Sequence, residues 1–128
     1  MELVFRLRRG DDLLAEIRRR AAALPAGYVA CCVGCVSRAR IRDASGVTIR
    51  ELSEPLEIVS LTGTVSAARC HLHISLSRED LSTVGGHLCE GCIVNTTAEI
   101  VLRELPDCRF GAEQDAQTGY DELTVSPR

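Results

Sequence analysis

Polar and hydrophobic residues alternate along most of the chain, and this pattern predicts a protein built mainly from short β-strands. Residues 2–8 place charged side chains between apolar ones, as expected for a half-buried strand. Residues 28–36 form a nearly continuous apolar run that favours a buried strand, and alternation continues through residue 42. Further strands are predicted at residues 47–52, 56–66, 70–77 and 93–105, and a last short stretch at 120–125 follows a polar loop at 111–119.

One segment near the N-terminus predicts a helix instead. Apolar residues recur there at helical spacing: Leu13, Leu14, Ile17, Ala21 and Leu24. Asp11 or Asp12 can cap its start, and Pro25 ends it. A single helix cannot supply the crossovers that a parallel sheet needs. We therefore expect an α+β fold in which residues 1–128 form a single domain, with a core of about 2–125, a mostly antiparallel β-sheet and one main helix.

The segment from His71 to His87 carries all three histidines of the chain. Side chains alternate between the two faces of a strand, so His71 and His73 point one way and their apolar neighbours the other. Gly85-Gly86 predicts a tight turn that returns His87 to the first two imidazoles. Three converging imidazoles would hold Zn²⁺ or another divalent metal and leave one position open. The alternative is a cluster of polar sheet residues or subunit-interface hydrogen bonds.

The seven cysteines suggest a less probable metal site. Cys32 and Cys35, together with Cys89 and Cys92, match a nominal two-pair zinc pattern, but their separation far exceeds the usual gap of ~15–20 residues. An odd number of cysteines without a disulfide spacing indicates a reducing compartment. We interpret most of them as small core residues.

Charge and composition narrow the classes of partner. The net charge is −3, and all fifteen basic residues are arginines, so the chain as a whole does not attract nucleic acid. The face formed by Arg38, Arg40 and Arg42 could bind an anion, although keeping a sheet edge soluble is the favoured interpretation. No apolar run approaches the ~20 residues that span a bilayer, so we expect no membrane partner and an intracellular, cytoplasmic location.

Three segments of the sequence resemble those of one protein family. They are Glu57-Ile58-Val59-Ser60-Leu61-Thr62-Gly63-Thr64, His71-Leu72-His73-Ile74-Ser75-Leu76-Ser77, and Gly85-Gly86-His87-Leu88 followed by Thr97-Ala98-Glu99-Ile100-Val101-Leu102. Their order and spacing resemble the PPC (plants-and-prokaryotes conserved) domain from the first strand to about Leu123. The resemblance implies an α+β fold on an antiparallel sheet and assembly as a homotrimer. It also places the three histidines where stand-alone members carry them, and where some of those members hold a metal.

Plant members carry the domain beside AT-hook motifs that bind DNA, but this chain contains no Arg-Gly-Arg-Pro core. Our first hypothesis is therefore a stand-alone PPC-like homotrimeric binding or assembly module, whose histidine site takes a divalent metal or a small anionic ligand. The alternative is a metal-dependent hydrolase or lyase in which Glu57 or Glu99 moves protons, although carboxylates of this kind are more often surface or strand-pairing residues. A DNA-binding regulator is the weaker alternative, by analogy with AT-hook proteins.

Overall fold

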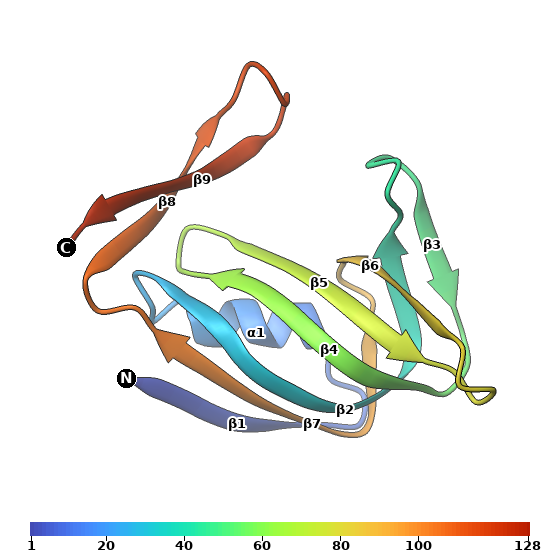
Figure 1. Cartoon of the computed structure of the whole chain (residues 1–128). Coiled ribbons are helices and arrows are strands. Elements are labelled where there is room, and N and C mark those ends of the chain that lie inside the picture. Colours follow the sequence, from blue (N-terminus) through green and yellow to red (C-terminus); the bar gives the residue numbers. More distant parts are fainter.

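The computed structural model describes residues 1–128, and nine strands and one helix make up its regular elements (Figure 1). Their bounds are β1 Glu2–Arg8, α1 Leu13–Ala21, β2 Gly27–Arg42, β3 Ile49–Leu52, β4 Leu56–Val65, β5 Cys70–Ser77, β6 Thr83–Leu88, β7 Ile93–Glu104, β8 Cys108–Gln114 and β9 Asp121–Pro127. The nine-residue helix lacks the length to cross a membrane, and no other helix is present.

The main sheet has seven strands and confirms the predicted α+β class. Its order is β1-β7-β2-β4-β5-β6, and β3 pairs separately with β2. Every pairing is antiparallel. The two strands predicted at residues 56–66 and 70–77 form a hairpin, since β4 pairs with β5 across the turn between them. Strands β8 and β9 form a second, two-stranded sheet that stands apart from the first (Figure 1).

Strand β2 is long enough to take part in two regions of the main sheet. Its first part pairs with β4 and β7, whereas its last residues pair with β3 and β6. Register shifts between Val29 and Cys31, Gly34 and Cys35, and Val36 and Arg38 interrupt the ladder with β7. Such bulges bend a strand and increase its twist. The bend closes the path β2-β4-β5-β6 back onto β2 and brings Arg42 opposite His87.

The core lies between α1 and one face of the sheet and continues inside the closed path. Helix α1 begins as predicted, because the Asp12 carboxylate accepts a hydrogen bond from the Ala15 amide at 3.0 Å. The buried face of the helix, including Leu13 and Ile17, belongs to the same cluster as Leu72 and Leu76 of β5. One continuous apolar cluster therefore fixes the orientation of β5, and with it the face on which its polar residues lie.

Two local predictions were wrong. Gly85 and Gly86 lie within β6 rather than at a turn, and residues 78–82 make the connection from β5. The polar segment at 111–119 is only partly a loop, because β8 continues to Gln114 and pairs with β9. In β8 only Phe110 is buried, so this strand lacks the apolar alternation by which strands are predicted. Its backbone hydrogen bonds with β9 maintain it instead.

Candidate metal centre

Strand parity places His71 and His73 on the outer face of β5. Leu72, Ile74 and Leu76 point into the core and are buried. The residues between them must then face away from the core, because side chains alternate along a strand. The predicted division of this segment into an apolar face and an imidazole-bearing face is confirmed.

His87 joins them through the pairing of β5 with β6, in which His73 lies opposite His87. The glycines before it allow the strands to approach closely. A Cβ atom on Gly85 would overlap the carbonyl oxygen of Ile74, and one on Gly86 would lie 2.7 Å from the carbonyl oxygen of Arg42. The Gly-Gly pair thus brings the third histidine to the other two, as predicted, but through strand packing rather than through a turn.

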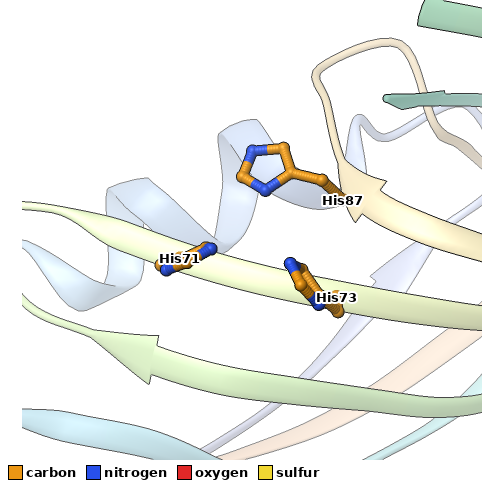
Figure 2. Close-up of side chains that lie close together, drawn as sticks. All are labelled: His71, His73 and His87. Atoms are coloured by element: carbon orange, nitrogen blue, oxygen red, sulfur yellow. The ribbon is translucent and has the colours of Figure 1, made fainter. Parts of the chain in front are cut away.

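The three imidazoles converge on one point above the sheet (Figure 2). Their ring centroids are 5.2 Å apart for His71 and His73, 5.3 Å for His71 and His87, and 5.7 Å for His73 and His87. One nitrogen from each ring lies within 4.8 Å of the others. A tetrahedral metal ion about 2.0–2.1 Å from each of three nitrogens places them roughly 3.4 Å apart, so the imidazoles must move closer together by side-chain rotation when a metal binds.

Burial keeps two of these rings neutral near pH 7. Partial burial is the largest cause that lowers the pKa of His87 to about 4, and the charge of Arg42 is the next. Burial, followed by the charge of Arg69, also lowers the pKa of His71. Neutral imidazole is the form that binds metal. The lowered pKa values of His71 and His87 therefore favour the form that binds metal.

The ring of His87 also leaves a polar atom without a partner. Its Nδ1 atom is buried and makes no hydrogen bond. Buried polar groups are normally paired, and an unpaired one destabilises the folded state unless a ligand or ion satisfies it. This orphaned nitrogen and the donor set of three imidazoles both fit a divalent metal such as Zn²⁺.

Strand β4 borders the cluster. Thr62, Gly63 and Thr64 of β4 line a cavity of about 310 Å³ together with His71 and His73. Gly63 has a positive φ of 150°, and a Cβ atom there would overlap the carbonyl oxygen of His71. Glycine at this position therefore keeps β4 tightly paired beside the site.

Three residues near the cluster were not predicted as part of the site: Arg42, Tyr120 and Glu122. Arg42 is the register neighbour of His87, and its guanidinium lies 5.9 Å from the ring centroid of Tyr120. Glu122 of β9 is close enough for its charge to favour the protonated form of His71. The sequence marked Arg42 as a member of an arginine face, but no local pattern links it or the hairpin residues to His87.

Glu57 and Glu99, the predicted acid-base candidates, lie elsewhere on the sheet. Glu57 is opposite Cys35 and Ser77, and it lies five positions before Thr62 on β4. At about 3.3 Å per residue the distance along the strand is roughly 16 Å. Glu99 lies between Arg6 and Val33. The structure does not bring either carboxylate to the three histidines.

None of the cysteines belongs to the cluster of metal-ligating side chains that the histidines form. Cys32 packs against the core, whereas Cys35 donates a hydrogen bond to the carbonyl oxygen of Asn95 at 2.6 Å. Cys92 is buried and accepts a hydrogen bond from the Arg40 amide at 3.2 Å. All seven thiols are free. Only Cys92 lies in the core, and Cys32 and Cys70 pack against it, so the interpretation of most of the cysteines as core residues was wrong.

Known proteins share this fold and much of this sequence. A bifunctional protein GlmU from Synechococcus sp. strain JA-2-3B'a(2-13) is 43% identical over 125 residues, which are 96% of this chain and 20% of the relative. The chain thus spans about a fifth of the length of the curated relatives it matches.

Two solved structures extend the comparison. A hypothetical protein from Salmonella cholerae-suis is 32% identical with a TM-score of 0.95, over 100% of this chain and 94% of that one. A metal-containing protein from Archaeoglobus fulgidus is 28% identical with a TM-score of 0.73, over 97% and 93% of the two chains. Residues 1–106 match the model of the Plants and Prokaryotes Conserved (PCC) domain, which confirms the resemblance to the PPC domain. The chain belongs to the Plants and Prokaryotes Conserved domain family.

Proposed function

We propose that this protein is a metal-binding assembly module in which His71, His73 and His87 hold a divalent metal, with Zn²⁺ as the best match. The observation that carries the proposal is the convergence of three imidazole nitrogens within 4.8 Å on one outer sheet face. The unpaired Nδ1 atom of His87 and the lowered pKa of that ring support it. The existence of a metal-containing relative at 28% identity supports it further.

The bound metal would supply a Lewis-acid position with one site open to water or to a ligand. Hydrolysis would in addition need a group that moves protons near that position. Glu57 and Glu99, the predicted acid-base residues, lie elsewhere on the sheet and not beside the histidines. Binding of a ligand is therefore favoured over hydrolysis as the role of the site.

The proposed module is a homotrimer, and the outer face of the sheet supports self-association. Val4, Val33 and Val59 are apolar but 72%, 57% and 59% exposed. Val4 lies opposite Val101 in the pairing of β1 with β7, and Val101 lies opposite the exposed Cys31 of β2, so an apolar band crosses these three strands. Contacts between copies of the chain would remove this band from water. Sedimentation equilibrium tests the assembly, and a monomer at all concentrations would contradict it.

Metal analysis tests the proposed site. Protein purified without an affinity tag should contain about one divalent metal per chain, and metal-free protein should take up Zn²⁺ in calorimetry with a rise in melting temperature. The variant His71→Ala/His73→Ala/His87→Ala should lose both responses. Ser75→Ala, on the same face of β5, is the matched control and should keep them. A wild-type protein without metal and without a thermal response to Zn²⁺ would refute the proposed site.

A further inference from the structure

The surroundings of the histidine cluster carry a positive charge without a partner. Arg42 faces His87 across the pairing of β2 with β6, and side chains at paired positions lie on the same face of a sheet. Its Nε atom is buried and makes no hydrogen bond. A guanidinium has five donors arranged to match a carboxylate or a phosphate. Arg42 is thus a strong anion-binding group next to the metal ligands with its donors unused.

Two neighbouring arginines are paired with carboxylates, whereas Arg42 is not. Arg40 forms an ion pair with Glu51 at 3.3 Å, and Arg50 forms one with Asp43 at 3.0 Å. Asp43 follows Arg42 in sequence, but its carboxylate is occupied by Arg50 and by the hydroxyl of Ser45. Arg42 forms no ion pair within 4.0 Å.

The β8–β9 hairpin fixes the position of this guanidinium. The ring of Tyr120 lies 5.9 Å from the Arg42 guanidinium carbon, within the range of a cation–π contact. The Tyr120 hydroxyl donates a hydrogen bond to the carbonyl oxygen of Gly46 at 3.4 Å. The tip of the hairpin is thereby attached to the turn between β2 and β3, and Arg42 loses less freedom when it binds a ligand.

A cavity connects Arg42 with two of the histidines. It has a volume of about 350 Å³, and its lining residues are Arg42, Asp43, Ala44, Gly46, His73, Gly85, Gly86 and His87. Gly85 and Gly86 contribute no side chains, so the floor of the cavity is open backbone. The size suits a small molecule. A group that enters this cavity reaches the guanidinium and the imidazoles together.

The net charge of the site indicates what kind of ligand it binds. A divalent metal on three neutral imidazoles adds two positive charges beside Arg42. Glu122 is the carboxylate whose charge reaches the cluster at His71, and it offsets one of them. The remaining excess positive charge, in a partly buried site, disfavours metal binding unless an anion accompanies the metal.

We propose that the ligand of this site is a small molecule with an oxyanion group, a carboxylate or a phosphate, that occupies the open position of the metal and accepts hydrogen bonds from Arg42. This inference rests on the proposed metal site and names the class of ligand it takes. Arg42 recognises the anion, and Tyr120 positions Arg42.

Cobalt-loaded protein provides the test, because the visible absorption of Co²⁺ reports its ligands. Metal-free protein is first titrated with Co²⁺ alone, and the loaded protein is then titrated with acetate in one series and inorganic phosphate in another. The variants are Arg42→Gln, Arg42→Lys and the matched control Arg38→Gln, which changes the same charge on the same strand outside the cavity. Thermal melting confirms that each variant is folded.

Wild type and Arg38→Gln should bind one of the two anions with a spectral change. Arg42→Gln should weaken anion binding roughly tenfold or more. Arg42→Lys should have an intermediate anion affinity, because lysine keeps the positive charge but cannot donate two parallel hydrogen bonds as a guanidinium does. Co²⁺ affinity without anion should stay equal or rise in Arg42→Gln, since a repulsive charge is removed. The preferred anion distinguishes a carboxylate ligand from a phosphate.

Two results would overturn the inference in different ways. Equal anion binding by wild type and Arg42→Gln would exclude Arg42 as the anion-binding group and leave the metal site intact. Absence of Co²⁺ binding to the wild type, both without an anion and with acetate or phosphate present, would remove the metal site and the bridging arrangement with it.

Discussion

Histidines and cysteines can both bind metal, but burial shifts their pKa values in opposite directions. Partial burial lowers the pKa of His87 to about 4, which favours the neutral ring that binds metal. Burial raises the pKa of Cys32 to about 12 and that of Cys92 to about 11, which disfavours the thiolate that binds metal. The same loss of hydration therefore prepares His87 as a ligand and makes Cys32 and Cys92 inert.

Spacing separates the two groups as clearly as burial does. His71 and His73 are two residues apart on a strand, so they share a face. Cys32 and Cys35 are three residues apart on a strand, and Cys32 packs against the core while Cys35 bonds to Asn95. A Cys-x-x-Cys motif brings two thiols together in a turn, but an extended backbone separates them. A motif thus predicts a site only together with its secondary structure.

The largest expected effect is a difference in thiol reactivity between an exposed and a buried cysteine. A pKa raised from 9.0 to about 12 lowers the thiolate fraction of Cys32 by roughly a thousandfold at a given pH. Cys31 is exposed, so it should react quickly with a disulfide reagent at pH 8 while Cys32 reacts very slowly. Stopped-flow absorbance of wild type and Cys31→Ser measures both rates. An undiminished fast phase in Cys31→Ser would contradict the assignment.

Metal affinity should separate the two groups next. His73→Ala should weaken Zn²⁺ binding by at least about 100-fold, because loss even of a group that orients a ligand costs 10–100-fold. Cys35→Ser and Cys89→Ser should leave it unchanged, although Cys89 is only two residues from His87 and its thiol donates to the His87 carbonyl at 3.7 Å. Competition with a zinc-binding dye gives the affinities. A loss on Cys89→Ser equal to that on His73→Ala would assign a ligand role to the thiol.

Local patterns in the sequence predict much of the fold and the ligand set. Alternation predicts β1 and both faces of β5, and Asp12 predicts the start of α1. These features depend on residues a few positions apart, for which the periods of strand and helix are sufficient. The His-x-His spacing belongs to this group, since two residues on one strand share a face whatever surrounds the strand.

Features that depend on distant residues could not be predicted in this way. The pairing of Arg42 with His87 requires β2 to bend at its bulges, and no alternation pattern specifies that bend. Tyr120 reaches Gly46 because the β8–β9 hairpin stands apart from the main sheet. The Gly-Gly pair indicated a turn because close strand approach and turns both require residues without side chains. Long-range packing decided between the two.

Substitution of Gly86 should have an intermediate effect, and it tests whether strand packing builds the histidine site. A Cβ atom there would lie 2.7 Å from both the Arg42 carbonyl oxygen and the Ile41 Cγ2 atom, so Gly86→Ala should separate β6 from β2. We expect a loss of about 1–3 kcal/mol in the free energy of unfolding and weaker Zn²⁺ binding. Urea denaturation and calorimetry measure the two effects.

The control is Gly111→Ala on β8, where the nearest atom is the Thr124 hydroxyl, which can rotate away. This variant should keep both the stability and the zinc affinity of the wild type. If Gly86→Ala bound Zn²⁺ as tightly as Gly111→Ala does, the close approach of β6 would not be what positions His87.

The pH dependence of the metal-free protein should be the smallest effect, and it tests whether burial keeps the histidines neutral. In the unfolded chain His87 takes up a proton near its usual pKa of 6.5, but in the folded protein it does so only near 4. Between these values the unfolded state binds more protons, so the free energy of unfolding falls as the pH falls from 6.5 towards 4 and is fully retained above 6.5. His71, whose pKa is also lowered, contributes in the same direction.

Melting curves between pH 6.5 and 5 measure this slope while the carboxylates of Asp43 and Glu54, whose pKa values are lowered by their hydrogen-bond partners, remain ionised. We expect the melting temperature to fall by roughly 2–4 °C, since partial exposure reduces the effect. His87→Gln should flatten the curve because glutamine does not titrate. Zn²⁺ should make the wild-type curve steeper, since protons then compete with the metal for the same nitrogens. If His87→Gln kept the wild-type slope with and without Zn²⁺, burial of this ring would not be the source of its readiness to bind metal, and the contrast with the buried thiols would rest on spacing alone.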